Sequence, residues 1–527
     1  MTTVPSNTTP GEPPCSLPST EQLLAEGGDA RIALDPLTGL NKYGCPPHPD
    51  PQLLALGSST ASVISEPGFA AADQLRNTLL PLLAKEPEVA IYARELQRIR
   101  SELIQLCDIA DLPGIEIAFA SSGTDLHLIG AQYVSGCEPK PMLVVMVDAV
   151  ETGSSVIAAL SGRHFSNRSA LGYPTIEGAP IPGSCAIEVA TVSIRLADDS
   201  PRPTSDVDAE VTALTEAAAA KGQRVLLIPI DQSKTGLIAP SPACAAALKR
   251  RLPNVVDVLV DACQFRISPA TLRAYLEQNF MVALTGSKFM AGPTFSAALL
   301  IPPATAQRLR TLPLPPALSA YSARADWPLN WTAAEGLDRV ANFGLLLRWE
   351  AALQALRAFR AVPQEAVAHF MKTFADAILQ RLASDPGFEP LPVFQLDRRP
   401  LIEPDNWDHL PSIFPFLLFH AEKKIRTQPL SRKETRQVYQ WLQRDLTQQH
   451  YFDISGLSNP TASLRCQFGQ PVACGSRDGI PVSALRLCLS ARMIVDAASG
   501  DGRGAAAVIE QALAALDKTA LLAGQVR

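Results

Sequence analysis

Two nearby stretches decide how this chain folds: "LVDACQFRIS" at 259–268 and "ALTGSKFMAGPTFSAALL" at 283–300. The first stretch ends an apolar, β-branched run with Asp261, and the second places Lys288 in a Gly- and Ser-rich turn between two apolar runs. Short apolar runs that are bounded by turn residues are typical of buried strands. Because an ammonium group is strongly hydrated, a lysine between two such strands calls for a chemical explanation.

Further strands of this kind alternate with helical periods along the first three hundred residues. The stretch 72–107 carries apolar residues at helical spacing, interrupted near Pro87, and Ala-rich helical stretches cover 208–222 and 242–252. Buried strands that alternate with helices predict a parallel or mixed sheet covered on both faces. The expected strands are 114–120, 141–149, 185–194, 224–230, 255–262 and 280–286.

A second pattern follows a proline- and aromatic-rich segment that starts at residue 313. Long amphipathic stretches at 344–359, 364–384 and 432–446 come first, then a strand-like piece at 484–490 and an Ala-rich helix at 504–523. This predicts a large α/β domain followed by a smaller C-terminal α+β domain. The expected boundaries are 1–26 for a flexible leader, 27–70 for an N-terminal segment draped on both domains, 71–312 for the large domain, 313–343 for an interdomain or dimer segment, and 344–527 for the small domain.

The composition excludes several classes of protein. Of the 527 residues 47% are hydrophobic and 19% are charged, as in a well-packed globular protein of two or more domains. The net charge is 46 − 52 = −6 without a dense basic run, which argues against a nucleic-acid partner. No apolar span is long enough for a membrane, and we expect neither an export signal nor a location outside the cytoplasm. The ten scattered cysteines predict reduced thiols and no metal site.

Three of the expected strand ends carry residue types that bind anions or react. In an α/β sheet, ligands bind at the carboxyl ends of strands. The stretch "FASSGTDLHLIG" (119–130) ends one strand and opens a helix, whose free backbone N–H groups and hydroxyls form an anion cradle. The residues at the three ends are Ser122, Gly123, Thr124, Asp261, Gln264, Thr285, Ser287 and Lys288.

An anion cradle, a carboxylate and a loop lysine together suggest pyridoxal phosphate as the cofactor. A desolvated site favours the neutral amine of Lys288, which can then form a Schiff base with the aldehyde. Asp261 against the pyridine nitrogen would keep that nitrogen protonated and make the ring an electron sink. The amide of Gln264 near the phenolic oxygen would hold the ring.

These residues resemble the class V aminotransferase and cysteine desulfurase group of fold-type I pyridoxal-phosphate enzymes. D-x-x-Q at Asp261–Gln264 is followed by T-G-S-K at 285–288 and then by "FMAGPTFSAALL". In that family the loop has the pattern Ser/Thr-x-His-Lys-x-x-Gly-Pro, whereas here serine replaces the histidine and the glycine comes one residue later. The resemblance covers roughly 55–500 and implies a fold-type I homodimer with its active site near the subunit interface.

The resemblance also implies which residues hold the phosphate and the substrate. A hydroxyl of the neighbouring subunit often completes the phosphate cup, and Thr332 is a candidate for it. Arg486 in "SALRLCLSAR" matches the arginine that grips the substrate α-carboxylate in a bidentate fork, with Arg492 as the alternative. The expected phosphate contacts within the chain are Ser122, Gly123, Thr124, Thr285 and Ser287.

Two departures from the family pattern concern the ring and the thiol. Where family members stack an aromatic residue on the ring, this chain has Glu151-Thr152-Gly153, so Thr152 or His164 would take that place. Desulfurases carry a nucleophilic cysteine some fifteen residues before the arginine. Here Cys474 lies twelve residues before Arg486, and a bystander thiol is the simpler interpretation.

Each of these residues also has a purely structural interpretation. Asp261 could cap a strand, Lys288 could extend to solvent, and Arg486 could form an ion pair at a sheet edge. By strand alternation Cys263 should point away from the cofactor. His127 and His164 fit packed or hydrogen-bonded roles better than catalytic ones. The polar segment 27–51 is expected to line the substrate entrance.

Three functional hypotheses follow. The first is an aminotransferase acting on a small amino acid, in which Lys288 also carries the proton. The second is a lyase or desulfurase-like enzyme acting on a cysteine derivative. The third is a catalytically inactive protein that keeps the fold for binding alone, and the intact Asp261, Gln264 and Lys288 argue against it.

Overall fold

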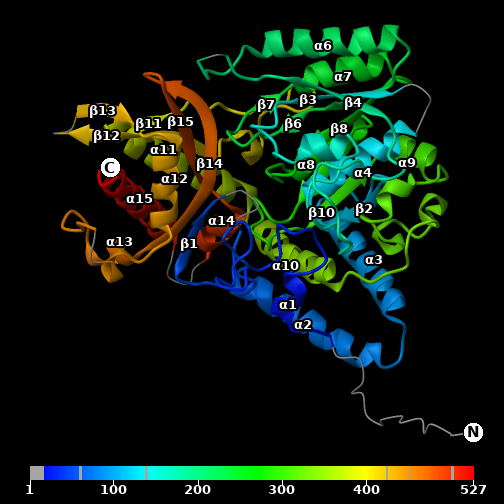
Figure 1. Ribbon diagram of the computed structural model, residues 1–527, viewed down its shortest axis with the longest axis horizontal. Coiled ribbons are helices and arrows are strands. Elements are labelled where there is room, and N and C mark those ends of the chain that lie inside the picture. The colour runs from blue at the N-terminus through cyan, green and yellow to red at the C-terminus, as the bar shows by residue number, and fades with distance from the viewer. Residues whose placement is uncertain are drawn as a thin grey trace, which may run out of the picture.

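Two sheets, each covered by helices, make up the protein (Figure 1). The computed structural model describes residues 17–57, 62–136, 141–196, 198–422, 425–449, 452–499 and 504–526. Residues 1–16 of the expected leader lie outside the described part. The helix α1 (Thr20–Leu24) follows, and its Leu23 and Leu24 are buried, so this end of the expected leader packs against the rest of the protein.

The larger sheet has the strand order β2-β10-β9-β8-β5-β3-β4. All of these strands run parallel except β10, which is antiparallel to both of its neighbours. The expected strands between 114 and 286 are all present. The bounds are β2 (Glu116–Ala120), β3 (Met142–Val147), β4 (Ile187–Val192), β5 (Val225–Ile228), β8 (Val256–Asp261), β9 (Met281–Thr285) and β10 (Ala297–Ile301), and the short β6 (Ile230–Asp231) and β7 (Ile238–Ala239) extend the sheet beside β8.

Helices cover both faces of this sheet. Val145 and Val258 belong to one hydrophobic cluster, whereas the adjacent Val144 and Leu259 belong to another. Because successive side chains of a strand point to opposite faces, this division shows that each face has its own core. The helices of this part are α2 (Glu66–Leu83), α3 (Glu88–Leu106), α4 (Gly123–Ser135), α5 (Val156–Leu160), α6 (Thr204–Ala220), α7 (Pro242–Arg251), α8 (Pro269–Glu277) and α9 (Pro303–Leu309). Short 3₁₀ turns follow at Pro316–Leu318, Arg324–Asp326 and Thr332–Ala334.

The smaller sheet joins strands from the two ends of the chain. Its order is β1-β14-β15-β12-β11, with β13 beside β12. The strand β1 comes from the N-terminal segment and runs parallel to β14, with Leu53 opposite Arg465. The bounds are β1 (Leu53–Leu56), β11 (Phe388–Pro390), β12 (Ile413–Glu422), β13 (Ile425–Pro429), β14 (Arg465–Arg477) and β15 (Ile480–Cys488).

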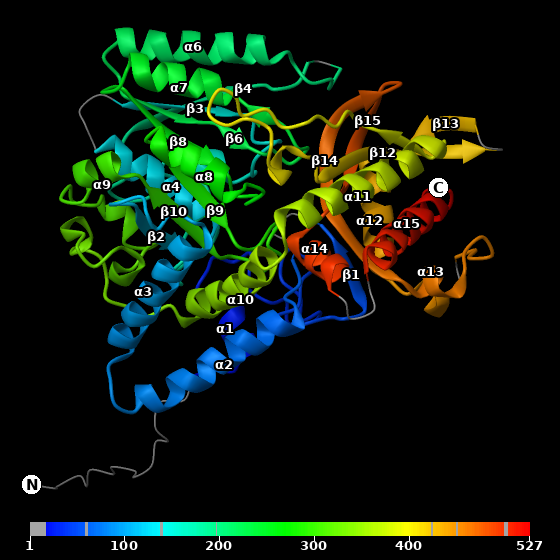
Figure 2. The same cartoon turned by 180° about the vertical axis from the view of Figure 1, so that it is seen from behind.

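Long helices connect and cover the two sheets. Figures 1 and 2 show α10 lying beside α2 between them, and α10 also contacts α3 and α14. The helices are α10 (Phe343–Arg360), α11 (Gln364–Ser384), α12 (Arg432–Leu442), α13 (Asn459–Ser463), α14 (Ala491–Ala498) and α15 (Gly504–Ala523), with 3₁₀ turns at Trp407–His409 and Leu446–Gln448. The predicted fold class, a large α/β domain with a mainly parallel sheet and a smaller α+β domain, is therefore confirmed.

Three expectations from composition can be compared with the structure. Among the described residues, no helix has the length and apolar character needed to cross a membrane. In the same residues no cluster of His, Cys, Asp and Glu could hold a metal ion. The expectation that every cysteine is reduced is wrong for Cys185, which is disulfide-bonded. Seven other cysteines are free and buried.

Candidate active site

One cavity of about 580 Å³ brings the predicted residues together. It opens where β3, β6, β8 and β9 end and where the register between β14 and β15 shifts after Gly469. Its volume lies in the range of small-molecule sites. The residues that sequence analysis singled out and that line this cavity are Ser122, Gly123, Thr124, Thr152, Asp261, Gln264, Thr285, Ser287, Lys288 and Arg486. Their roles toward a cofactor stay predictions, but their convergence is a property of the fold.

The first turn of α4 forms the expected anion cradle. Ser122 caps the helix: its backbone N–H donates to Asp125 Oδ2 (2.8 Å), and its Oγ accepts from the Asp125 N–H (3.3 Å). Gly123 allows a close approach, because a Cβ there would lie 2.9 Å from Cys263 Sγ. The hydroxyl of Thr285 donates to the Cys263 carbonyl (2.6 Å), which ties the end of β9 to the turn after β8 that faces Gly123.

Arg31 adds a permanent cation to this cradle, and sequence analysis did not assign it a role. Its Nη1 donates to Thr124 Oγ1 (3.2 Å) and its Nη2 to Ser122 Oγ (3.1 Å). Burial alone would lower the pKa of Arg31, but Tyr43 and the paired Asp29 raise it above the ordinary value. Arg31, Lys42 and Tyr43 line the cavity, as expected for the segment 27–51, whose unusual polar composition was the only signal of this position.

Asp261 lies at the end of β8 beside His127 from α4. His127 Nε2 is 3.4 Å from Asp261 Oδ2, and His127 Nδ1 donates to the Gly123 carbonyl at 2.7 Å. Burial would raise the pKa of Asp261, but His127 and then Lys288 hold it well below its usual range. Burial would likewise lower the pKa of His127, yet Asp261 raises it. The carboxylate is thus kept ionised, and His127 has the hydrogen-bonded role expected of it.

The raised pKa of His127 predicts how its contribution to stability depends on pH. A group whose pKa is raised by folding stabilises the folded state below its unfolded pKa, and this contribution disappears as pH rises through the folded pKa. The difference in the free energy of unfolding between the parent and the less stable His127→Gln should therefore be largest at about pH 5 to 6. The difference should shrink at alkaline pH, as measured by urea denaturation.

His164→Gln provides the matched control. Burial lowers the pKa of His164, so its replacement should not produce a difference that shrinks as pH rises. A difference for His127→Gln that stays constant from acidic to alkaline pH would contradict the pairing with Asp261.

Several buried polar atoms of the cavity have no hydrogen-bond partner among the described residues. Buried polar groups are almost always paired in folded proteins, so such a cluster indicates a polar ligand. A hydroxylated, protonated ring carrying a phosphate would offer partners of the right kind. The atoms are Thr152 Oγ1, Gln232 Nε2, Gln264 Oε1, Ser296 Oγ and Arg486 Nε. Pyridoxal phosphate fits the residues that are present.

Arg486 on β15 is buried beneath the cavity. Its Nη1 donates to the Lys234 carbonyl (3.1 Å) and its Nη2 to the Gln470 carbonyl (2.8 Å). The alternative residue, Arg492, lies on α14 and does not line the cavity. Between the two arginines, only Arg486 is placed to meet a ligand here.

Of the two residues considered for the ring face, only Thr152 lines the cavity. His164 does not, and its Nδ1 lies 2.6 Å from the Tyr321 hydroxyl. Thr332 is exposed and its hydroxyl lies 3.4 Å from the Arg310 carbonyl, so a role in a partner's phosphate cup stays a prediction.

The cysteines near the site differ from one another in position. Cys263 lines the cavity, so the expectation that it points away is wrong. The reason is that β8 ends at Asp261 and a turn follows, in which strand alternation no longer applies. Cys474 is buried on β14, and burial together with Asp199 raises its pKa to about 12. Such a thiol is a poor nucleophile at neutral pH.

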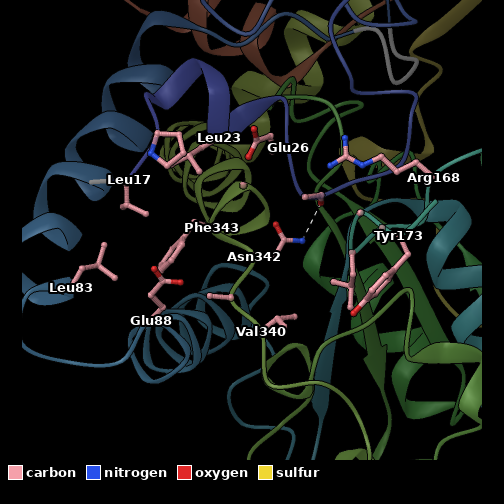
Figure 3. A pocket seen from close by; sticks show the side chains of 17 residues that line it. Leu17, Leu23, Glu26, Leu83, Glu88, Arg168, Tyr173, Val340, Asn342 and Phe343 are labelled. Carbon is pink, nitrogen blue, oxygen red and sulfur yellow. Dashed lines mark hydrogen bonds between the residues drawn. The ribbon is translucent and has the colours of Figure 1, made fainter. Parts of the chain in front are cut away.

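A second cavity, of about 400 Å³, holds none of the predicted residues. Figure 3 shows it between the N-terminal segment and the start of α10, where Asn342 Nδ2 donates to the Gly27 carbonyl (3.0 Å). Leu17, Leu23, Leu83 and Phe343 form its apolar side. Its lining shows how the N-terminal segment is anchored and lacks the paired reactive groups of the larger cavity.

Among known proteins, only solved structures are similar to this chain. Neither a protein-family model nor a curated protein matches the chain. Serine palmitoyltransferase of S. paucimobilis with bound PLP is similar at 13% identity over 88% of this chain and 87% of that chain (TM-score 0.46). The cysteine desulfurase CsdA of Escherichia coli is similar at 13% identity over 89% and 94% (TM-score 0.48).

A third similar structure is the cystine C-S lyase C-DES with its product cysteine persulfide. It shares 13% identity over 84% of this chain and 95% of that chain, with a TM-score of 0.49. At this level of similarity, the assignment of a function depends on the residues of the cavity itself.

Proposed function

We propose that this protein binds pyridoxal phosphate in the cavity of about 580 Å³ and uses it to transform an amino acid, as an aminotransferase. The observation that carries the proposal is the convergence of Lys288 and an ionised Asp261 on one cavity with unpaired buried polar atoms. His127 and Lys288 keep the Asp261 carboxylate charged inside the protein, so it is ready to bind a protonated pyridine nitrogen.

Each part of the cofactor would meet groups of suitable chemistry. The first turn of α4, with Thr285, Ser287 and Arg31, would hold the phosphate. Asp261 would hold the ring nitrogen, Gln264 the phenolic oxygen, and Thr152 one face of the ring. When bound, the cofactor supplies an aldehyde that condenses with amines and a ring that withdraws electrons from the substrate Cα.

The protein's own residues would orient the substrate and move the proton. Arg486 would bind the α-carboxylate through the N–H groups that its backbone contacts leave free. Lys288 would take the proton from the substrate Cα and return it to another atom. The buried walls of the cavity would exclude water, which strengthens these electrostatic contacts.

The reactivity of the thiols bears on the choice between an aminotransferase and a desulfurase. A desulfurase-like reaction needs a reactive cysteine near the substrate, whereas burial raises the pKa of Cys474 to about 12 and that of Cys263, which lines the cavity, well above its ordinary value. This favours the aminotransferase over a desulfurase, and a lyase, which needs no thiol, stays the alternative. We further propose that the protein acts as a homodimer in the cytoplasm on a small-molecule substrate, with Thr332 facing the partner subunit.

Reduction with borohydride tests the proposed cofactor. The protein purified with pyridoxal phosphate should be yellow, should lose this colour on reduction, and should carry the label on the peptide that contains Lys288. A keto acid product, with the cofactor converted to its amine form, identifies an aminotransferase. Pyruvate with released sulfur would instead identify the lyase branch, and a colourless protein without label would refute the function.

Arg31→Ala is expected to weaken cofactor binding. The arginine contributes a charged hydrogen-bond donor at the cradle, so its loss should raise the Kd for pyridoxal phosphate by roughly 10- to 100-fold. Fluorescence titration of the apoprotein measures this change. Arg76→Ala, which removes an arginine outside the cavity, should leave the Kd as in the parent; equal effects of the two substitutions would contradict a role of Arg31 at the phosphate.

A further inference from the structure

Lys234 and Arg486 are two cations in the buried or half-buried lining of the cavity that stay without a carboxylate partner after the cofactor is accounted for. Lys42 also lines the cavity, but it is exposed, so solvent screens its charge. The described lining contains two carboxylates, Glu151 and Asp261. Asp261 faces His127, and Glu151 Oε1 accepts from Arg195 Nε (2.6 Å). Among the described residues, neither Lys234 nor Arg486 forms an ion pair. The buried and half-buried lining of the cavity thus keeps two unneutralised positive charges, those of Lys234 and Arg486.

The backbone contacts of Lys234 show that its position is built into the fold. Its N–H donates to the Glu151 carbonyl (2.9 Å) and its Nζ to the Val150 carbonyl (3.1 Å). The Glu151 carboxylate binds the two flanking residues, accepting from Ser233 Oγ (2.8 Å) and from the Thr235 N–H (3.2 Å). The loop that carries Lys234 is therefore fastened to the loop after β3, beside the predicted ring position.

Lys234 and Arg486 lie next to each other. Arg486 Nη1 donates to the carbonyl of Lys234 itself, so the guanidinium sits under the loop that carries the amine. Burial and then the charges of Arg486 and Lys288 lower the pKa of Lys234 to about 8. Holding two like charges together in a half-buried cavity is unfavourable, and an anionic group bound at each of them removes this cost.

We infer that the substrate is an amino acid whose side chain ends in a second carboxylate, bound by Lys234 while Arg486 binds the α-carboxylate. This inference rests on the proposed function and names its substrate class. One carboxylate would leave one of the two cations unpaired, whereas a dicarboxylic amino acid of the aspartate or glutamate type matches both charges. Glu151 cannot serve as the partner of Lys234, because its carboxylate oxygens are already bound to Arg195, Ser233 and Thr235.

The test compares the binding of two unreactive probes to the protein purified with pyridoxal phosphate. Succinate carries two carboxylates and propionate carries one. Isothermal calorimetry should give a Kd for succinate about 10-fold or more below that for propionate, the ratio expected from one charge-assisted contact. Lys234→Met should remove this preference by raising the Kd for succinate about 10-fold, whereas the Kd for propionate should change far less.

Two further variants control for charge and for general damage. Lys234→Arg keeps the charge and should retain most of the preference for succinate. Lys372→Met removes an exposed lysine of α11 and should behave as the parent. Equal binding of the two probes by the parent protein, or an equal loss of both in Lys234→Met, would overturn the inference.

The outcome is separable from that of the proposed function. If only the substrate class is wrong, the protein will still be yellow and reducible on Lys288, and it will convert neutral amino acids as well as aspartate or glutamate. If the proposed function is wrong, no labelled Lys288 peptide will be found, whatever the two probes do, and the inference will fall with it.

Discussion

Lys288→Ala is expected to abolish turnover while the fold stays intact. The amine at this position would both hold the cofactor and carry the proton. The other two lysines that line the cavity, Lys42 and Lys234, belong to other segments than the turn after β9. We expect kcat to fall by about 10³-fold or more, the scale of a lost general acid–base group combined with a lost covalent anchor. Steady-state kinetics with the best substrate measures the effect.

Two readouts separate lost chemistry from lost structure. The melting temperature of Lys288→Ala should stay close to that of the parent, because Lys288 is only half-buried and forms no ion pair among the described residues. Added small amines should restore part of the proton transfer. Undiminished activity of Lys288→Ala would refute the assignment.

Asp261→Asn is expected to give the second largest effect. The asparagine is nearly the same size but carries no charge, so the ring nitrogen would lose the ion that keeps it protonated. We expect kcat to drop by about 10²- to 10³-fold, as when one preorganised electrostatic contact is removed, while the cofactor still binds. Kinetics and the absorbance of the bound cofactor measure the two quantities.

The His127 ring supplies a readout of Asp261→Asn that does not depend on catalysis. Because Asp261 raises the pKa of His127, the asparagine variant should show a lower pKa for this ring in an NMR titration. The same substitution at a distant aspartate, Asp385→Asn, should change neither kcat nor the pKa of His127. A full rate for Asp261→Asn would place the ring nitrogen elsewhere.

The large sheet could be predicted from the sequence because its strands are buried on both faces. Runs such as 141–149 and 255–262 are β-branched without alternation and are bounded by turn residues, the pattern of a covered parallel sheet. The same pattern predicted that Asp261, Thr285 and Lys288 lie close together, because the carboxyl ends of parallel strands meet at the same edge of a sheet.

The remaining residues of the site lie where periodicity carries no information. Arg31 belongs to an irregular segment and meets Ser122 across 91 residues, a contact that no local pattern encodes. Lys234 lies in the loop between β6 and β7, strands of two residues each, which are too short to be recognised in a sequence. Cys263 was misplaced because alternation was extended beyond the last residue of its strand.

The pairing of β1 with β14 constrains how the protein can be made. Residues 53–56 leave the ribosome early, but their neighbours in the sheet begin only at Arg465. During synthesis this apolar segment stays unpaired until β14 has been made. Exposed strand edges favour aggregation during this period. Since Arg31 reaches the cradle from the same segment, loading of the vitamin is expected to follow synthesis of β14.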